Sequence, residues 1–244
     1  MPTQIIMVTY HRPNDFKLSI ESIIQNTLCP YHLSIIDNSK GKIDHVLDIY
    51  QHNKNITIYR NQYNIGKGAA VNRWYNTIMC NNQLSHFVSI DSDIIVPCGW
   101  LLEMQRSFYH TKRATKVGLI APVIFNNQRE TWKYQLSNRA IMHDTSILSP
   151  QFHLYPGLYY NRYTAGPLII IDTKLFETTG LFYDKQLYGA DDGQLCATAY
   201  KHQAFIGINS NLSVQHINHD SDHEYIQWKE RNITMDVDQH GRWD

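Results

Sequence analysis

Charged and polar side chains suited to ligand binding follow four apolar segments in the first half of the chain. The four polar segments are Thr9-Tyr10-His11-Arg12, Asp37-Asn38-Ser39, residues 61–67 and Asp91-Ser92-Asp93. If the apolar segments are parallel strands, the polar segments meet at one edge of a sheet, because ligands of open α/β sheets bind beyond the carboxyl ends of the strands. The spacing therefore predicts a ligand site built from several strand ends.

Asp91 and Asp93 form the pair with the most distinctive chemistry. Side chains alternate along an extended backbone, so both carboxylates are expected on one side, with Ser92 opposite. Two like charges so close repel unless a cation lies between them. A hard divalent ion such as Mg²⁺ or Mn²⁺ binds one or two carboxylates together with substrate phosphates. The same spacing also occurs in solvated turns and helix caps, and that alternative stays open for the motif alone.

The elements that must position these residues alternate between short apolar strands and stretches with helical periodicity. Strands are predicted over residues 5–9, 33–36, 56–59, 87–90, 168–171, 205–208 and 212–214. Helices are predicted after Asn14 as a cap, over residues 43–50 and 71–78, from 175 to Gly180, and from Asp191 to about His202. This alternation is typical of the α/β class, with a mostly parallel central sheet flanked by helices.

Composition and charge narrow the class of protein. The 244-residue chain carries 22 Lys and Arg against 22 Asp and Glu, so no global field attracts nucleic acid or an anionic membrane. No apolar stretch approaches the roughly 18 residues that a membrane span needs. The 4 cysteines are scattered without a C-x-x-C pair, which is typical of reduced, packed thiols. We therefore expect a soluble cytoplasmic protein whose core needs no disulfide.

Several segments resemble family 2 glycosyltransferases with the GT-A fold, and they occur in the order that the family has them. The matching segments are V-T-Y-H-R-P, I-I-D-N-S, N-I-G-K-G-A-A-V-N-R, V-S-I-D-S-D, A-G-P-L-I-I-I-D-T-K-L-F-E-T-T-G-L-F, G-A-D-D-G-Q-L-C and V-Q-H-I. The resemblance implies one GT-A catalytic domain over residues 1–216, with a nucleotide-sugar-binding half over 1–120 and an acceptor-binding half over 121–216. The tail over residues 217–244 either folds over the donor or is an exposed polar segment.

The resemblance implies a nucleotide-sugar donor, with a UDP-sugar favoured. Asp37 matches the carboxylate that contacts the base in the family, and Thr9 and Tyr10 lie on the loop that borders the base. The further donor-binding candidates are Arg12, Asn64, Gly66, Lys67, Arg73, Asp91 and Ser92. Taken alone, Asp37 also fits an Asx turn, and residues 64–68 also fit a plain turn before a helix.

The same resemblance implies a metal site and a catalytic pair. Asp93 matches the direct ligand of Mn²⁺ or Mg²⁺, and Asp91 and His216 are the further candidate ligands. Such an ion stabilises the negative charge of a departing diphosphate. Asp192 matches the catalytic base that takes the proton of the acceptor hydroxyl, and Asp191 precedes it. A helix N-terminus would stabilise both carboxylates without any activity, so helix capping stays an alternative.

Aromatic residues crowd the stretch from 123 to 163. Trp132 and Tyr160 are candidate acceptor-binding residues, because a flat apolar face with a polar edge suits a sugar ring. Ordinary packing is the alternative, and it is the one we favour for most aromatic residues of the stretch.

Together these observations favour a metal-dependent, inverting glycosyltransferase that moves a sugar from a UDP-sugar to a saccharide or glycoconjugate, as in surface-polysaccharide biosynthesis. A non-enzymatic carbohydrate- or nucleotide-binding module is the first alternative. Gln194 and Thr198 motivate it, because many relatives carry an acidic residue and an arginine at these positions. A zinc hydrolase is the second alternative, and its candidate ligands are His216, His219, Asp220, Asp222 and His223.

Overall fold

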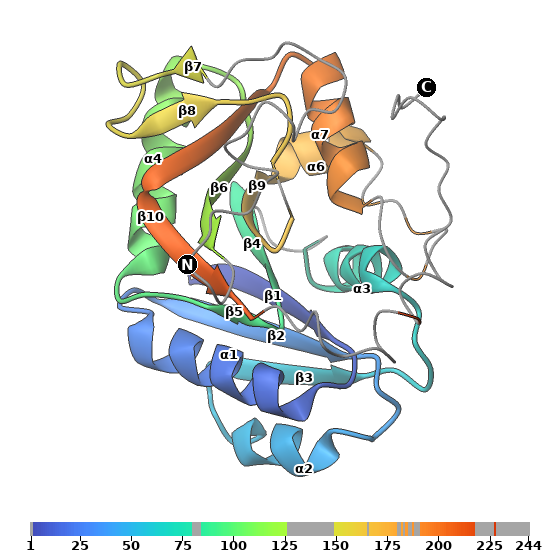
Figure 1. Cartoon of the computed structure of the whole chain (residues 1–244). Coiled ribbons are helices and arrows are strands. Elements are labelled where there is room, and N and C mark those ends of the chain that lie inside the picture. The colour runs from blue at the N-terminus through green and yellow to red at the C-terminus, as the bar shows by residue number, and fades with distance from the viewer. Residues whose placement is uncertain are drawn as a thin grey trace.

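The computed structural model describes residues 2–79, 84–125, 149–164, 166–179 and 191–217, together with 182, 184, 187 and 227. Trp132, residues 219–223 of the candidate zinc cluster and nearly all of the tail lie outside these described residues. The described strands form one sheet with helices on both faces (Figure 1). None of the described helices combines the length and apolar character that a membrane-crossing segment requires.

The first half of the chain builds the parallel part of the sheet. Its strands are β1 (Thr3–Thr9), β2 (Tyr31–Asp37), β3 (Ile56–Arg60) and β4 (His86–Asp91). They lie in the order β3-β2-β1-β4, and each neighbouring pair is parallel. The near-continuous apolar residues of β1, β2 and β4 suit strands that are buried on both faces, whereas β3 lies at the edge of the sheet and buries only Ile56. The register pairs Thr9 with Asp37 and Val8 with Asp91, so the carboxyl ends of β1, β2 and β4 meet at one edge, as the sequence predicts.

The second half extends the sheet, mainly with antiparallel strands. Its strands are β5 (Ile94–Ile95), β6 (Val117–Phe125), β7 (Ser149–Pro150), β8 (Leu158–Tyr160), β9 (Leu168–Asp172) and β10 (Phe205–His216). β9 lies between β4 and β6 and runs antiparallel to both, whereas β10 is parallel to β6. The short β5 pairs with the last residues of β10 and sets His216 opposite Ile94. This pairing ties the end of β10 to the segment that follows β4.

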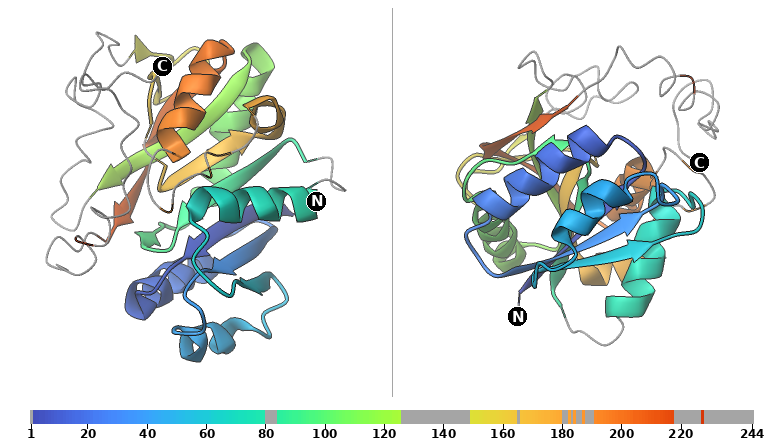
Figure 2. Two further views of the ribbon diagram at one scale, coloured as in Figure 1. Left: turned by 90° about the vertical axis from the view of Figure 1, so that its right-hand side faces the viewer. Right: turned by 90° about the horizontal axis from the view of Figure 1, so that it is seen from below.

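Helices pack on both faces of the sheet. They are α1 (Pro13–Asn26), α2 (Asp44–Leu47), the 3-10 turn η1 (Asp48–Tyr50), α3 (Lys67–Trp74), the π-helical turn η2 (Tyr75–Met79), α4 (Trp100–Ala114), α6 (Thr173–Thr179) and α7 (Asp191–Lys201). One buried cluster joins Ile5 and Met7 of β1 to α1 and α4, and another joins Ile6 to α3, α6 and α7. The side chains of successive β1 residues thus point to opposite faces of the sheet, as the alternation along a strand requires. In the left-hand view of Figure 2, α3 and α7 both face the viewer.

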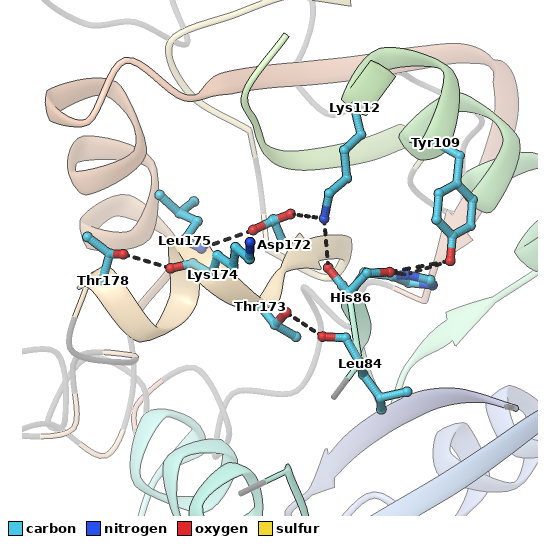
Figure 3. A network of polar contacts seen from close by, with 10 residues as sticks. Leu84, His86, Tyr109, Lys112, Asp172, Thr173, Lys174, Leu175 and Thr178 are labelled. Carbon is cyan, nitrogen blue, oxygen red and sulfur yellow. Dashed lines mark hydrogen bonds and ion pairs between the residues drawn. The ribbon is translucent and has the colours of Figure 1, made fainter. Parts of the chain in front are cut away.

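A polar network lies where β4 begins and β9 ends, at the end of the sheet opposite the carboxyl end of β4 (Figure 3). His86 begins β4, Asp172 ends β9, and the two residues pair across the strands. Lys112 of α4 places its Nζ 2.6 Å from Asp172 Oδ2. The other oxygen, Asp172 Oδ1, accepts a 3.1 Å hydrogen bond from the backbone N–H of Leu175 and so caps α6. The network therefore anchors α4 and α6 to the ends of β4 and β9.

Several local details differ from the sequence prediction. α1 begins at Pro13, because proline needs no N–H partner at the first helical position, so Asn14 lies inside the first turn rather than at the cap. The helix predicted over residues 43–50 is divided into α2 and η1. The two strands predicted near the end form the single strand β10, with an irregular register between Asn209 and Ser213. α4 and β6 are absent from the sequence prediction.

Candidate active site

β2 ends at a carboxylate that is completely buried. Asp37 is 0% exposed, and its Oδ1 accepts a 2.7 Å hydrogen bond from the backbone N–H of Ser39, which is an Asx turn. The turn uses only one oxygen, because Oδ2 has no hydrogen-bond partner among the described residues. Thr9, the register partner of Asp37, is also buried, and its Oγ1 makes no hydrogen bond with any described residue. Since unpaired buried polar atoms cost free energy, this pair fits a site that a ligand completes.

The loop after β1 borders this buried pair. Tyr10 follows Thr9, and its ring meets the ring of His11 edge-on, with 4.1 Å between the centroids. The backbone N–H of His11 donates a 2.7 Å hydrogen bond to Ser39 Oγ, which joins the loop to the turn after β2. The loop therefore lies beside Thr9 and Asp37, and its contact with a base stays a prediction.

The segment between β3 and α3 is a turn held by amide side chains, one of its own and one from the turn after β2. Asn64 Oδ1 accepts a 2.9 Å hydrogen bond from the N–H of Gly66, and Asn38 Nδ2 donates to the carbonyl of Gly66 at 3.3 Å. Gly66 has φ 81°, in the left-handed region that glycine adopts without strain. Arg73 of α3 donates to Asn61 Oδ1 at 3.2 Å and holds the start of the turn. Asn64, Gly66 and Arg73 thus shape this loop, and their contact with a donor stays a prediction.

Lys67, the first residue of α3, lies between two acidic segments. Its Nζ is 2.7 Å from Asp91 Oδ1 and 3.4 Å from Asp191 Oδ2, and it donates to the carbonyl of Gly166 at 3.3 Å. Burial lowers the pKa of Lys67, but the carboxylates of Asp91 and Asp191 outweigh it and the net shift is upward. For Asp91, burial raises the pKa to about 7, with Lys67 opposing the shift and Asp93 adding to it. The ammonium group therefore stays charged and joins the end of β4 to the start of α7.

Asp93 lies between a guanidinium and an imidazole. Arg12 Nη1 is 3.0 Å from Asp93 Oδ2, and Arg12 Nε is 2.9 Å from Asp15 Oδ2. On the other side, His216 Nε2 is 3.5 Å from Asp93 Oδ1. The pairing of β5 with β10 creates this approach, and the N–H of Ile217 donates to the carbonyl of Asp93 at 2.9 Å. The structure thus brings together Arg12, Asp93 and His216.

The two carboxylates of the D-x-D motif have different partners. β4 ends at Asp91, and the chain turns at Ser92 and Asp93, so the extended alternation expected from the sequence stops there. Asp91 pairs with Lys67, whereas Asp93 pairs with Arg12. In the described ranges, no three His, Cys, Asp or Glu side chains are grouped as a ready metal site. The two carboxylates instead pair with different cations, and each cation has a second carboxylate partner, Asp191 for Lys67 and Asp15 for Arg12.

Asp93 and His216 nevertheless fit a divalent ion. A carboxylate oxygen and an imidazole nitrogen within 3.5 Å of each other are ligand types that Mn²⁺ accepts. Mg²⁺ likewise binds through one or two carboxylates plus substrate phosphates rather than through a complete protein cage. These residues therefore fit an ion whose coordination a diphosphate completes.

Asp192 is held by hydrogen bonds on both carboxylate oxygens. Its Oδ2 accepts from the hydroxyl of Tyr163 at 2.9 Å and from the N–H of Gly166 at 3.0 Å, and its Oδ1 accepts from the N–H of Gly193 at 2.9 Å. Burial and the charge of Asp191 raise the pKa of Asp192, while Lys67, Tyr163 and Gly166 oppose the rise. A carboxylate with a raised pKa is a stronger base than an exposed aspartate. Helix capping alone explains neither the Tyr163 contact nor the Lys67 contact of Asp191.

Tyr160 lies apart from these acidic residues. It lines a cavity of about 490 Å³ that is formed by Thr115, Tyr160, Tyr200, Lys201, Gln203, Ala204 and Phe205. Tyr200 and Lys201 belong to the last turn of α7, whereas Asp192 lies in its first turn. At 1.5 Å per residue, the helix separates the cavity from Asp192 by about 13 Å. The role of Tyr160 in acceptor binding stays a prediction.

Tyr163 and Gly166 are site residues that the sequence analysis does not assign. Tyr163 stands among the aromatic residues of the stretch from 123 to 163, and Gly166 belongs to the A-G-P segment quoted for the resemblance. A Cβ at Gly166 would lie 2.7 Å from Asp192 Cβ, so only glycine allows this close approach. The contact joins residues 26 apart in the sequence, and no local pattern signals it.

Comparisons with known proteins identify the family and the fold. The family described as Glycosyl transferase family 2 matches residues 4–171 of the chain. No curated protein matches the chain.

Two solved structures resemble the fold, each with a TM-score of 0.65. GalNAc-T7, crystallised with UDP, GalNAc and Mn²⁺, is 14% identical, and the match covers 89% of this chain and 44% of that one. S. aureus TarS 1–349 is 16% identical, and the match covers 89% of this chain and 60% of that one. The chain thus spans less than two thirds of either structure, and the likeness concerns the GT-A fold. Because the family match covers more than half of the sequence, the chain belongs to glycosyl transferase family 2.

Proposed function

We propose that this protein is a metal-dependent glycosyltransferase that moves a sugar from a nucleoside-diphosphate donor to a hydroxyl of a saccharide or glycoconjugate. The observation that carries the proposal is the position of Lys67, whose Nζ lies 2.7 Å from Asp91 and 3.4 Å from Asp191. One ammonium group thereby joins the D-x-D segment to the acidic pair of α7. A transferase needs such a shared centre, because donor and acceptor must be held together in reacting geometry.

The buried oxygens at the ends of β1 and β2 support a nucleotide base as the ligand of this part of the site. Asp37 Oδ2 is an acceptor without a hydrogen bond among the described residues, and Thr9 Oγ1 lies on the register partner. An N–H group of a base would satisfy the carboxylate oxygen, and uracil offers one beside two carbonyl groups. A UDP-sugar is favoured through the family resemblance, and the GalNAc-T7 structure contains UDP. Tyr10 would border the base from the loop after β1.

Asp93 and His216 would hold Mn²⁺ or Mg²⁺, with Asp91 close to the donor. When bound, the ion stabilises the negative charge that develops on the departing diphosphate. Arg12 and Lys67 would supply further positive charge, because their side chains already reach the two carboxylates of the motif. Arg12 suits phosphate oxygens through its planar, forked set of donors, and Lys67 suits them as a point charge.

Asp192 would accept the proton of the acceptor hydroxyl as the new bond forms. Its raised pKa supports this role, since burial and Asp191 make the carboxylate more basic. If Asp192 and the diphosphate lie on opposite sides of the anomeric carbon, attack comes from behind the leaving group and inverts that carbon. Inversion is therefore part of the proposal.

The acceptor is proposed to lie along the second half of the domain. Residues 1–120 would bind the nucleotide sugar and residues 121–216 the acceptor, with the tail after 216 close to the donor. Tyr160 and the cavity near the end of α7 would contact a part of the acceptor remote from the reacting hydroxyl. An extended saccharide, as in polysaccharide biosynthesis, would reach both places.

Thermal unfolding with a panel of nucleotide sugars tests the proposal. A ligand that binds only the folded state at 100 times its Kd adds about 2.7 kcal/mol, which raises the Tm of a domain of this size by roughly 5 to 10 °C. We expect UDP-sugars to raise the Tm in the presence of Mn²⁺, and Asp93→Asn to lose the Mn²⁺-dependent part. The control Asp48→Asn, an exposed change, should respond as the unmodified protein does.

Release of UDP in the same samples, where water takes the sugar in place of the saccharide acceptor, separates a transferase from a binding module. We expect Asp192→Asn to bind the donor with Mn²⁺ and to release almost no UDP. Absence of any Tm change across the panel, with and without Mn²⁺, contradicts donor binding. Normal UDP release by Asp192→Asn contradicts the assigned base.

A further inference from the structure

We infer that Tyr163 is a positioning residue that holds the Asp192 carboxylate in the orientation from which it takes the acceptor proton. The inference deepens the proposed function and rests on it for the role of Asp192. The observation behind it is the 2.9 Å hydrogen bond from the Tyr163 hydroxyl to Asp192 Oδ2.

The donors around Asp192 leave a defined part of the carboxylate open. Tyr163 and the N–H of Gly166 both donate to Oδ2, whereas Oδ1 accepts only from the N–H of Gly193 in the described part of the chain. An ionised carboxylate offers about four lone-pair sites, so Oδ1 keeps one for an incoming hydroxyl. Tyr163 thereby selects which oxygen acts as the base.

The backbone that carries Tyr163 is docked against α7. The N–H of Thr164 lies 3.5 Å from Cys196 Sγ, and the thiol in turn donates to the carbonyl of Thr164 at 3.5 Å. Cys196 is one helical turn after Asp192, so both residues use the same face of α7 toward this segment. A Cβ on Gly166 would lie 2.7 Å from Asp192 Cβ, which makes the approach specific for glycine. Thr164 and Gly166, which follow Tyr163 in the sequence, therefore pack against α7, and this packing fixes the hydroxyl of Tyr163 relative to Asp192.

The charges around the pair keep Tyr163 a donor. Burial and the charge of Asp192 raise the pKa of Tyr163 well above its usual value, so its hydroxyl keeps its proton. The groups that face Asp192 are Asp191 on the same helix, Lys67 on α3, and Tyr163 with Gly166 on the segment before β9. Loss of the phenol removes one donor that favours the charged carboxylate. Without this donor, the equilibrium between the charged and the protonated form of Asp192 moves toward the protonated form, so its pKa rises.

The variant Tyr163→Phe tests the inference directly, because the ring keeps its packing and only the hydroxyl is lost. Carbon-13 NMR titration of the aspartate carboxyl groups in the metal-free protein measures the pKa of Asp192, whose signal is identified by its absence in Asp192→Asn. We expect the pKa of Asp192 to rise by roughly one unit, the scale of one hydrogen bond to a charged group. The acidic limb of kcat should move to higher pH by the same amount, with the KM for the donor unchanged.

Tyr75→Phe is the matched control. The hydroxyl of Tyr75, on η2, donates a 2.9 Å hydrogen bond to Glu177 Oε1, so this variant loses the same kind of phenol–carboxylate bond away from Asp192. We expect Tyr75→Phe to leave the pKa of Asp192 and the pH profile unchanged. Equal effects of the two variants indicate a general loss of stability and overturn the inference.

An unchanged Asp192 pKa in Tyr163→Phe also overturns it, whatever the turnover rate. The NMR titration needs no substrate, so it separates this inference from the proposed function. If Asp192→Asn keeps normal turnover while Tyr163→Phe shifts the Asp192 pKa, the assigned base is wrong and the inferred role of Tyr163 fails with it.

Discussion

The charges of individual residues explain how this site exists without a bound ligand. Asp91 and Asp93 would repel each other, but Lys67 pairs with one and Arg12 with the other. Partly buried carboxylates need such partners, because an uncompensated charge is costly to remove from water. The diphosphate of a nucleotide sugar carries two negative charges, and a divalent ion carries two positive charges. Lys67 and Arg12 can therefore turn from the carboxylates to the diphosphate while the ion binds the carboxylates. The charges of Asp91, Asp93, Lys67 and Arg12 therefore cancel before donor binding, and Asp15 and Asp191 share the same two cations.

His86 provides a prediction about pH at the level of one residue. Burial, with Lys112 nearby, lowers the pKa of His86 to about 4, and Asp172 opposes this shift. The unfolded chain binds the proton below pH 6.5 whereas the folded protein does not, so stability falls as the pH drops from 6.5 to 4. The loss amounts to at most about 3 kcal/mol.

Chemical denaturation of the protein and of His86→Phe at pH 7 and pH 4.5 checks this prediction. The phenyl ring preserves the contacts with the rings of Phe108 and Tyr109 but cannot bind a proton. The free energy of unfolding of the protein minus that of His86→Phe should fall between pH 7 and pH 4.5, because only the protein with His86 takes up the proton on unfolding. A difference that stays constant shows that His86 does not titrate in this range.

At the scale of secondary structure, the site depends on two contacts between elements that are distant in the sequence. β5 pairs with the end of β10 and carries His216 to Asp93. The segment before β9 packs on the first turn of α7 and carries Tyr163 to Asp192. Lys67 at the start of α3 then joins these two halves of the site. Regular elements, rather than loops alone, therefore fix the relative positions of the acidic residues.

Asp172 provides a prediction about the elements. One of its oxygens caps α6 and the other pairs with Lys112 of α4 at 2.6 Å. We expect Asp172→Ala to lower the free energy of unfolding by roughly 2 to 4 kcal/mol, because it removes both contacts. Asp172→Asn should cost about 1 kcal/mol less, since its amide oxygen still caps the helix.

Denaturant unfolding of both Asp172 variants measures these effects, with Asp48→Ala as the control. Asp48 makes an exposed ion pair with Arg60, and such pairs contribute about 0 to 1 kcal/mol. If Asp172→Ala costs no more than Asp48→Ala, the network of Figure 3 does not anchor α4 and α6.

Particular elements show what the sequence predicts at this scale. β1, β2 and β4 are mainly apolar runs that end in polar residues, so the sequence indicates both the strands and their ends. α4 is absent from the sequence prediction although its buried residues Trp100, Leu101, Met104 and Phe108 have helical spacing. β6 is likewise missed, because its last three residues fall in the stretch from 123 to 163, where the regular alternation of the sequence breaks down, although Asn126 and Asn127 follow its end. The direction of β9 depends on tertiary packing and has no local signal.

At the scale of the whole molecule, the order of motifs along the chain predicts the family and the GT-A fold. The fold then decides which predicted residues meet. Asp93 and His216 come together, and Lys67 links Asp91 to Asp191, as a site at the strand ends requires. Tyr160 lies at the other end of α7, because β8 pairs with the beginning of β10. Contacts such as Tyr163 with Asp192 could not be predicted, since only the assembled sheet brings these segments together.

Anomalous diffraction from crystals grown with UDP and Mn²⁺ tests the central claim most directly. The signal of manganese locates the ion independently of any assumed ligand. We predict one anomalous peak within bonding distance of Asp93 and His216, in contact with the diphosphate, with Asp192 facing the same cavity. A peak elsewhere, or a diphosphate bound in a cavity that Asp192 does not face, contradicts the account.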